Sequence, residues 1–349
     1  MKYYLKNPDF RFVRSFNIFC PHGQLVDIVV GAAKVDYPLT WDYPAYRLIK
    51  QGHWTCLQFE RPDNWSEFEI SITTDTSTDI AGTLTFVESM DGNELSDFLK
   101  TKRIVFLGAA RNCGERIQGS LQKISELAAL FGDYRIKVYE NDSEDNTLAC
   151  IQAEFLGNGK CELISETGLD KHLPQRTQRL AYARNKLLDA TVAQHADFDY
   201  VCWIDLDGLV DARFSTAGFL SNFGLDSVWD AVFPVTAPLY YDVWALREET
   251  MAPGDLVSRM KHEVPSVIGA RKDLHTAVQQ LAPGALRGWL RVESAFGGLG
   301  IYKMACARLG RYAGLFNNEE VCEHVPYHQA LIRSGARLYI NPQCVTHNP

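Results

Sequence analysis

From residue 103 onward, short apolar runs alternate with longer segments that carry apolar residues at helical spacing. Arg103–Leu107 and Tyr134–Glu140 are apolar runs of strand length, and Glu115–Phe131 between them has the period of an amphipathic helix. This order predicts a βαβ unit. Arg176–His195 predicts a second amphipathic helix, which leads into the buried strand Tyr200–Ile204. Later strands are predicted at Ala231–Val235, Gly298–Tyr302 and Arg337–Ile340. The pattern therefore predicts an α/β domain with a mostly parallel, Rossmann-like sheet.

The first hundred residues have a different pattern, in which short β-branched and aromatic runs recur between turn residues. These runs are Val26–Val30, Cys56–Glu60, Phe68–Ile72 and Thr83–Val87. We expect a smaller β-rich accessory domain over residues 1–95, followed by the α/β domain over residues 103–349. The boundary is predicted within Met90–Lys100, where the Asp91-Gly92 turn precedes a short amphipathic helix. Residues 238–290 contain four prolines and are interpreted as a loop-rich insertion.

Composition narrows the class of protein. Hydrophobic residues make up 46% of the chain and charged residues 22%, which is typical of a globular protein. The formal net charge is −8 and the sequence has no long Lys/Arg run, so nucleic acid is not expected as a partner. No apolar run is long enough to span a bilayer, and we expect no transmembrane segment. The nine cysteines stand singly without a CxxC pair, which favours reduced thiols and a cytoplasmic location.

Two carboxylates follow the most informative apolar run. Tyr200–Ile204 is followed by Asp205, Leu206 and Asp207, so strand alternation puts both carboxylates on one side. They stand at the carboxyl end of a strand, where open α/β sheets bind ligands. Such oxygen ligands suit Mg²⁺ or Mn²⁺, which also bind phosphate oxygens. A polar strand end can carry the same pattern, but the apolar run and the two loops upstream favour a metal site that receives a nucleoside diphosphate.

Two loops after the first strands are candidates for holding a nucleoside. The first follows Arg103–Leu107 and contributes Ala109, Ala110, Arg111 and Asn112, whose backbone and small side chains suit a base and ribose. The second follows Tyr134–Glu140 and contributes Glu140, Asp142, Ser143 and Asp145, of which an acidic side chain can accept ribose hydroxyls. Asp142, Ser143 and Asp145 can equally cap the helix that begins near Thr147, and we expect at least one of them to do so. Arg184 and Asn185, on the helix before Tyr200–Ile204, either reach the donor phosphates or sugar or belong to a solvated helix face.

Six segments together resemble a known family. They are ENDSEDNT, YARN, DYVCWIDLDG, YYDVWALR, SAFGGLGIY and the terminal VTHNP. The set resembles GT-A glycosyltransferases, and more narrowly the fungal capsule-associated and Golgi-type α-mannosyltransferases. The resemblance covers residues 103–349 and leaves the first hundred residues unexplained.

The resemblance implies a GT-A fold and transfer of a sugar from a GDP- or UDP-sugar to a carbohydrate or glycan hydroxyl, with mannose as one possible donor sugar. By position, Asp205 and Asp207 match the family's metal ligands, and His347 matches a histidine that completes the Mn²⁺ or Mg²⁺ site. Asp142, Ser143, Asp145 and Thr147 match its donor-side loop. Trp244, in the matched YYDVWALR segment, is the aromatic residue expected to contact the sugar.

A catalytic carboxylate is expected late in the chain. Glu323 and Glu320 precede a predicted helix and are the first candidates, followed by Asp242 and Glu293. An inverting enzyme would use such a group as general base on the acceptor hydroxyl. A retaining enzyme would use it to stabilise positive charge near the anomeric carbon.

Two other functions remain open from the sequence. A nucleotidyltransferase acting on a sugar phosphate also pairs carboxylates with a metal, and GAARNCGER supplies part of the basic, glycine-rich loop that it needs. A non-catalytic carbohydrate-binding protein would instead use the β domain.

Overall fold

The computed structural model describes the strand segments 2–6, 15–19, 25–32, 54–58, 68–74 and 85–87, and then residues 90, 92–249, 251–260, 264–286 and 289–348. The chain divides into two compact units. One comprises residues 1–90 with 287–291, and the other comprises residues 91–286 with 292–349. Each unit is described by itself below.

The first unit contains antiparallel strands. β5 (Phe68–Thr74) pairs with both β1 (Lys2–Lys6) and β3 (Leu25–Ala32). β2 (Ser15–Phe19) pairs with both β4 (Trp54–Gln58) and β6 (Thr85–Val87), and β4 also pairs with β12 (Trp289–Arg291). The four runs predicted from the sequence overlap β3, β4, β5 and β6. That residues 1–95 form an independent domain stays a prediction. The sequence did not indicate that β12, near residue 290, pairs with one of these strands.

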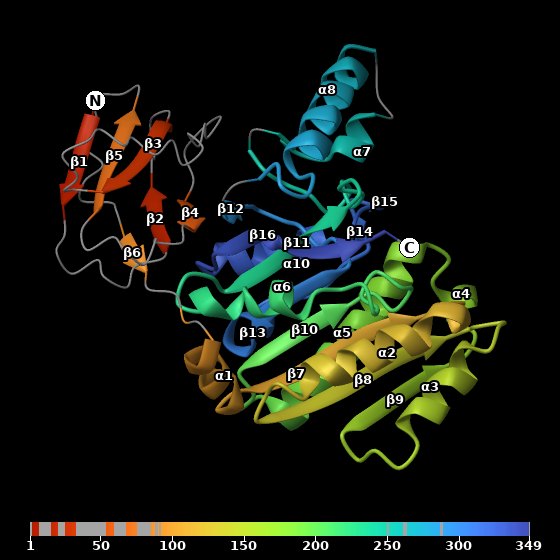
Figure 1. Cartoon of the computed structure of the whole chain (residues 1–349). Coiled ribbons are helices and arrows are strands. Elements are labelled where there is room, and N and C mark those ends of the chain that lie inside the picture. The colour runs from red at the N-terminus through yellow and green to blue at the C-terminus, as the bar shows by residue number, and fades with distance from the viewer. Residues whose placement is uncertain are drawn as a thin grey trace. The chain divides into compact units, whose positions relative to one another are not determined.

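The second unit is built on a mixed sheet whose strands follow the order β16-β11-β13-β10-β7-β8-β9 (Figure 1). These strands span β7 Arg103–Ala110, β8 Asp133–Asn141, β9 Cys161–Glu166, β10 Tyr200–Ile204, β11 Ala231–Ala237, β13 Leu299–Lys303 and β16 Leu338–His347. Neighbours are parallel except around β13, which runs antiparallel to both β10 and β11. The prediction of an α/β fold with a large, mostly parallel sheet is confirmed.

Helices cover both faces of this sheet. α2 (Gly114–Ala128) connects β7 to β8, and α3 (Thr147–Phe155) connects β8 to β9. Figure 1 shows both on one face, whereas α5 (Arg176–His195) returns along the other face to the central strand β10. This arrangement follows from right-handed crossovers, because the chain steps outward through β8 and β9 and then back. All five residues of β10 are buried, as expected for a strand covered on both faces.

The remaining helices are short or lie outside the crossovers. They are α1 Gly92–Lys100, α4 Leu169–His172, α6 Thr216–Leu220, the 3₁₀ turn η3 Phe223–Leu225, α7 Leu256–Arg259, α8 Val264–Gln280, α9 Met304–Ala307 and α10 His324–Arg333. A two-stranded hairpin, β14 Leu315–Phe316 with β15 Glu319–Glu320, precedes α10. Across the residues that the structure describes, no helix has both the length and the apolar character needed to cross a membrane.

Two elements differ from their sequence-based prediction. Residues 238–290 are not all loop, because α8 is a helix of 17 residues. Its proline, Pro265, is the second residue of the helix, where a missing N–H costs no intrahelical hydrogen bond. The last strand does not end at Ile340, because β16 continues through Pro342 to His347. Its register against β11 shifts between Pro234 and Val235, so that residues 342–344 bulge out of the pairing.

Candidate functional site

The carboxyl ends of the parallel strands bring distant segments of the chain to one edge of the sheet. β7 ends at Ala110, β8 at Asn141 and β10 at Ile204. β11 and β16 run in the same direction as β10, since both β10 and β11 are antiparallel to β13. The loops that follow these strands therefore meet at this edge, as ligand-binding loops do in open α/β sheets.

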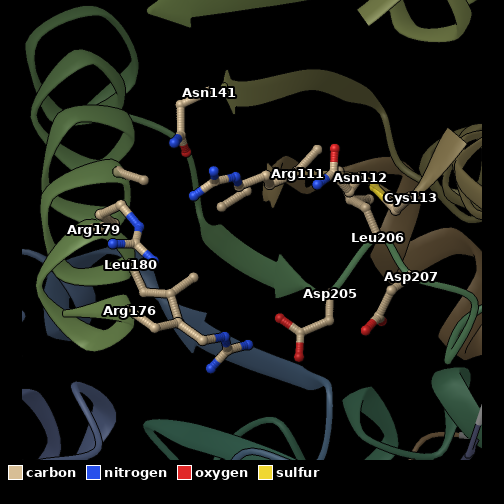
Figure 2. A pocket seen from close by; sticks show the side chains of 13 residues that line it. Arg111, Asn112, Cys113, Asn141, Arg176, Arg179, Leu180, Asp205, Leu206 and Asp207 are labelled. Atoms are coloured by element: carbon tan, nitrogen blue, oxygen red, sulfur yellow. The ribbon is translucent and has the colours of Figure 1, made fainter. Parts of the chain in front are cut away.

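A cavity of about 250 Å³ opens between these loops and α5 (Figure 2). Six of the predicted site residues line it, namely Ala109, Ala110, Arg111, Asn112, Asp205 and Asp207. The other lining residues are Cys113, Asn141, Arg176, Arg179, Leu180, Ala183 and Leu206. The structure therefore joins the loop after β7 to the pair of aspartates in a single cavity.

Asp205 and Asp207 stand just beyond the carboxyl end of β10. The backbone N–H of Asp205 donates to Gly298 across 2.9 Å, which extends the pairing of β10 with β13 by one residue. Asp207 opens to the cavity, but the cavity walls still remove part of its water. This burial, together with the negative charge of Asp205, raises the pKa of Asp207 to about 6, against opposing contributions from Arg116 and Arg176. The site thus holds more negative charge than its surroundings neutralise.

The pair fits a divalent cation by charge and by ligand type. Two carboxylates can hold Mg²⁺ or Mn²⁺ when phosphate oxygens and water fill the remaining positions. Among the residues that the structure describes, no three His, Cys, Asp or Glu side chains cluster as a metal-binding group. Asp205 and Asp207 are therefore the two side chains of the cavity lining that could hold such a cation.

Arginines surround the same cavity. Figure 2 shows Arg176 and Arg179 projecting from α5 on the side opposite the two aspartates. The side chain of Arg179 donates to the carbonyls of Leu173 and Pro174 across 2.8 and 2.7 Å, which holds it at the start of α5. Arg116 donates to the carbonyl oxygen of Asp207 across 3.3 Å. Cations on one wall and a cation-binding pair on the other suit a ligand that carries several negative charges.

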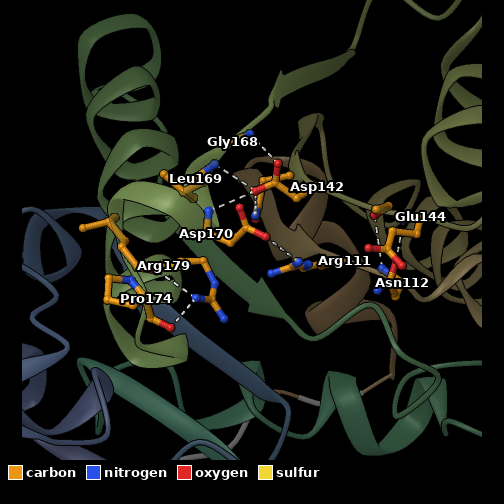
Figure 3. Close-up of polar contacts among 12 residues, drawn as sticks. Arg111, Asn112, Asp142, Glu144, Gly168, Leu169, Asp170, Pro174 and Arg179 are labelled. Atoms are coloured by element: carbon orange, nitrogen blue, oxygen red, sulfur yellow. Dashed lines mark hydrogen bonds and ion pairs between the residues drawn. The ribbon is translucent and has the colours of Figure 1, made fainter.

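The loops after β7 and β8 hold one another in place (Figure 3). Asn112, at a positive φ of 52°, donates its backbone N–H to Ser143 Oγ across 3.1 Å, and its side-chain oxygen accepts from the N–H of Glu144 across 2.8 Å. Asp145 accepts from the N–H of Thr147, the first residue of α3, and from the N–H of Gly114, the first residue of α2. The N-cap residue of α3 is Asn146, so Asp145 bonds the first N–H of the helix from one position before the cap, and the expected side-chain N-cap is not formed.

The other polar residues of the second loop also bind protein groups. Asp142 accepts from the backbone N–H groups of Gly168, Leu169 and Asp170 at the start of α4 (Figure 3). Glu140 is 2% exposed and accepts from the N–H of Ser143 and from Ser165 Oγ. These four residues, Glu140, Asp142, Ser143 and Asp145, are not among those lining the cavity. They organise the loop, and the ribose contact expected of an acidic side chain stays a prediction.

Arg184 lies behind the cavity and not on a solvated helix face. Its guanidinium is buried, and it lies 3.3 Å from Asp205 Oδ1 and 3.1 Å from Glu323 Oε1. The rings of Trp203 and Phe296 stand 5.3 and 4.9 Å from its guanidinium carbon. Burial alone lowers the pKa of Arg184, but the charges of Glu323 and Asp205 outweigh it and the net pKa is raised. Arg184 is therefore a permanent buried cation that contacts Asp205 from the side away from the cavity.

The other predicted site residues on this side of the sheet do not line the cavity. Asn185 uses both ends of its amide on the backbone of Tyr312. Glu323 is 4% exposed and paired with Arg184, so it does not face the cavity. Glu320 is exposed and accepts from Thr177 Oγ1 across 3.0 Å, and the side chain of Glu293 is exposed on the surface. Trp244 is partly buried, and it is not one of the residues that line the cavity.

Asp242 is the late carboxylate that the structure brings toward the aspartate pair. It lies in the loop after β11 and accepts from the backbone N–H of Gly297 across 3.0 Å. Burial raises its pKa to about 6, with further increases from the charges of Asp205 and Glu323 against an opposing effect of the Gly297 hydrogen bond. The neighbouring Tyr241 is 42% exposed, and the pKa of its hydroxyl is raised by partial burial and by the charges of Asp205, Asp242 and Asp207.

His347 reaches the same edge of the sheet as the last residue of β16. It pairs with Ala237 at the carboxyl end of β11, and its backbone N–H donates to Leu209 across 3.2 Å. His347 thus lies at the same end of the sheet as the two aspartates, and its role as a ligand stays a prediction.

Four residues of the site were not predicted from the sequence: Asn141, Arg176, Arg179 and Tyr241. A signal for two of them was present, because Arg176 and Arg179 precede Leu180 and Ala183 at the spacing of a single helix face. For Asn141 the helpful sign was its position as the last residue of a strand. Tyr241 carries no sequence signal that separates it from the buried Tyr240 beside it.

Comparison with known proteins gives structural similarity only. No protein-family model matches the sequence, and no curated protein matches it. The mannosyltransferase PcManGT from Pyrobaculum calidifontis, solved with GDP-Man and Mn²⁺, is 16% identical over 71% of this chain and 57% of its own, with a TM-score of 0.42. Glucosyl-3-phosphoglycerate synthase from Mycobacterium tuberculosis is 16% identical over 73% of this chain and 72% of its own, with a TM-score of 0.39. TarS from S. aureus is 11% identical over 70% of this chain and 60% of its own, with a TM-score of 0.41.

The present chain thus spans less than two thirds of PcManGT and of TarS. At these identities and TM-scores, the function has to be argued from the geometry of the cavity itself.

Proposed function

We propose that the chain is a metal-dependent glycosyltransferase of the GT-A type, which transfers a sugar from a nucleoside diphosphate sugar to a hydroxyl of a carbohydrate acceptor. The observation that carries this proposal is the composition of one cavity. Two carboxylates suited to Mn²⁺ or Mg²⁺, Asp205 and Asp207, lie across from Arg176 and Arg179. A nucleoside diphosphate supplies the negative charges that both sets of groups require.

The charges of the cavity support departure of the nucleoside diphosphate. A divalent cation held by Asp205 and Asp207 would supply neutralisation of the charge that develops on the diphosphate. Arg176 and Arg179 stabilise the same charge from the α5 side. Arg116 keeps the loop of Asp207 in place through the carbonyl of that residue.

Asp242 is the residue that we propose for the acceptor hydroxyl. Its side chain is fixed by the Gly297 N–H, and its pKa of about 6 leaves it mostly ionised at neutral pH. A carboxylate in this state can accept a proton from a hydroxyl in an inverting reaction, or stabilise positive charge near the anomeric carbon in a retaining one. The partly exposed ring of Tyr241 is suited to the apolar face of a sugar. This assignment replaces Glu323, which is buried against Arg184.

The identity of the donor sugar is supported only by the resemblance of the six sequence segments, so mannose stays a prediction. The acceptor is proposed only as a carbohydrate or glycan.

The proposal is tested by release of nucleoside diphosphate from UDP- and GDP-sugars in Mn²⁺ and in EDTA. We expect Mn²⁺-dependent release by the wild-type chain and its loss in Asp207→Asn, because one charged ligand of a hard cation is removed. Asp189→Asn is the matched control, since this carboxylate is exposed on α5 and paired with Arg311 on the surface. Wild-type turnover by Asp207→Asn would contradict the metal assignment.

Two other outcomes of the same assay identify the alternative functions. Release of pyrophosphate from a nucleoside triphosphate and a sugar phosphate would indicate a nucleotidyltransferase. Binding of oligosaccharide without turnover of any nucleotide would indicate a carbohydrate-binding protein.

A further inference from the structure

The segment before the β14–β15 hairpin follows α5 toward its first turn. The backbone of Tyr312 pairs with the side-chain amide of Asn185, in the middle of α5, across 2.9 and 3.0 Å. Two residues later, the carbonyl of Gly314 accepts from Thr177 Oγ1 across 2.8 Å. Since α5 begins at Arg176, which lines the cavity, this segment runs toward the cavity end of the helix. The hairpin therefore begins beside the cavity wall.

The base of the hairpin is fixed tightly to α5. Glu320 Oε1 accepts from Thr177 Oγ1 across 3.0 Å, and the N–H of Val321 donates to the carbonyl of Gly314 across 3.1 Å. A Cβ on Gly314 would lie 2.3 Å from the backbone of Thr177 and Gln178, so a larger residue there would push the hairpin away from the helix. The sequence thus permits an unusually close approach of the hairpin to the first turn of α5.

The chain that leaves the hairpin is fixed to the site as well. Three residues after Glu320, the carboxylate of Glu323 pairs with Arg184, and Arg184 contacts Asp205. The hairpin is therefore held on one side by the first turn of α5 and on the other by the buried ion pair behind Asp205. Its tip has a defined position relative to the cavity.

The tip exposes an aromatic ring among polar side chains. Phe316 is 65% exposed and pairs across the hairpin with Glu319. Asn317 and Asn318 form the turn between them, at positive φ values of 51° and 65° that suit a two-residue hairpin turn. Both asparagines and Glu319 are exposed. One flat apolar surface is thus surrounded by two carboxamides and a carboxylate.

This combination of groups fits a neutral sugar unit. The apolar face of a sugar ring stacks on an aromatic ring, while carboxamides and a carboxylate bind hydroxyl groups. Residues 315–320 contain two glutamates and no lysine or arginine, so a phosphate group would meet only like charge there. The tip therefore suits the carbohydrate acceptor and does not suit the nucleotide donor.

Phe316 lies near the cavity but outside it. It is two residues from Gly314, so its Cα is within about 7 Å of the glycine that touches α5. It is not one of the residues that line the cavity. A sugar that reacts at the aspartate pair therefore cannot stack on Phe316 at the same time. Only a further unit of the same acceptor chain can do so.

We propose that the β14–β15 hairpin is an acceptor-binding arm, on which Phe316 holds a sugar unit beyond the one that receives the transferred sugar. The acceptor is then a glycan of several units and not a free monosaccharide. The inference rests on the proposed function, and it adds the class of acceptor and a residue that determines specificity for it.

The dependence of turnover on acceptor length tests the arm. The acceptors are mannose, glucose and xylose with their hexamers mannohexaose, maltohexaose and xylohexaose, each assayed with UDP- and GDP-sugars in Mn²⁺. For the series that the enzyme uses, we expect kcat/KM to be at least about 10-fold higher for the hexamer than for the monosaccharide, the ratio that one aromatic contact supplies.

Variants of Phe316 then show whether the ring supplies this preference. Phe316→Ala should raise KM for the hexamer about 10-fold with little change in kcat, and leave KM for the monosaccharide unchanged. Phe316→Trp keeps a flat ring and should retain the preference. Leu156→Ala is the matched control, because Leu156 is 86% exposed just after α3, on the sheet face opposite α5. Thermal unfolding and donor hydrolysis without acceptor should be the same in all four proteins.

The outcomes separate this inference from the proposed function. Equal use of monosaccharides and hexamers, or an equal effect of Phe316→Ala on both, would overturn the role of the arm. Donor hydrolysis that none of the six sugars stimulates would overturn a glycan as its ligand. Both results leave the proposed donor site intact. Absence of Mn²⁺-dependent release of nucleoside diphosphate from every donor would overturn the proposed function, and the arm with it.

Discussion

Arg184 Nη2 lies 3.3 Å from Asp205 Oδ1, on the side of the carboxylate that faces the protein interior. The same guanidinium donates through Nε to Glu323, and the side chains of Arg184 and Glu323 are 4% and 5% exposed. The buried guanidinium of Arg184 therefore contacts Asp205, and the buried carboxylate of Glu323 fixes that guanidinium in turn. Glu323, at the start of α10, acts on the cavity through Arg184 and is a positioning residue.

Replacement of Arg184 by Met should destabilise the fold and impair cation binding. Glu323 would be left as an unpaired buried charge, and breaking such a pair costs about 3–5 kcal/mol. Chemical denaturation measures this loss, and calorimetry measures the affinity for Mn²⁺ with UDP or GDP.

The double variant Arg184→Met/Glu323→Leu separates the two effects. Removing both charges should recover much of the unfolding free energy, because a buried pair replaced by apolar groups is often neutral. The affinity for Mn²⁺ with nucleotide should stay low, since Asp205 has lost its partner. Recovery of both quantities would show that Arg184 serves the fold alone.

Asp242 should make the stability of the metal-free protein depend on pH. Its folded pKa of about 6 lies above the ordinary value of 3.8. The folded state therefore binds an extra proton between these values, and the unfolding free energy falls as pH rises from about 4 to 6. Asp242→Asn should remove this part of the decline. The full shift corresponds to roughly 3 kcal/mol, and we expect about 1–2 kcal/mol because Asp242 is only partly removed from water.

The measurement is denaturation in EDTA at pH 4, 6 and 8 for both proteins. The difference between them isolates Asp242, since other carboxylates such as Asp207 contribute equally to both. A difference that does not change with pH would show that Asp242 has an ordinary pKa.

Much of the sheet could be predicted because local patterns decide it. The bounds of α5 and β10 match the sequence-based prediction residue for residue, since a long amphipathic helix and a five-residue apolar run each have one clear interpretation. The helix α8 was not predicted, because the four prolines of residues 238–290 indicated loops. The continuation of β16 was missed because Pro342 cannot donate a ladder hydrogen bond, and the bulge that accommodates it depends on the partner strand.

The candidate site divides along a similar line. Asp205, Asp207 and the loop after β7 were predictable, because strand ends and their direction bring them to one edge. The acidic residues of the second loop were ambiguous, because a carboxylate that caps a helix and one that binds ribose look the same in sequence. The structural role of Asp142 follows from the three backbone N–H groups of residues 168–170 that donate to it, and these residues lie more than twenty positions away in the sequence. Such long-range pairing has no sequence signal.

Arg176→Ala should weaken binding of nucleoside diphosphate by about 10-fold, as expected for the loss of one charge-assisted contact. The side chain is exposed at the first turn of α5 and faces the cavity, so the variant should fold normally. Arg311→Ala is the control, because Arg311 is paired with Asp189 on the surface. The effect of Arg176→Ala should shrink at high salt, since an exposed charge is screened. An unchanged affinity at low salt would remove Arg176 from the phosphate site.

The final prediction concerns His347, which we expect to bind the same cation as Asp205 and Asp207. A neutral imidazole is a competent ligand for Mn²⁺, and the pairing with Ala237 brings this residue to the correct edge of the sheet. Removing the tail after Val345 is a poor test, because Thr346 is buried and its hydroxyl donates to Gly297 across 2.7 Å. The point variant His347→Ala keeps that hydrogen bond.

His347→Ala should weaken nucleotide binding about 10-fold in Mn²⁺ and leave it nearly unchanged in EDTA, because only the cation connects this side chain to the diphosphate. Gln343→Ala, at an exposed position of the same strand, should match the wild-type protein in both conditions. A loss of equal size in Mn²⁺ and EDTA would mean that His347 supports the loop at Leu209 and does not bind the metal.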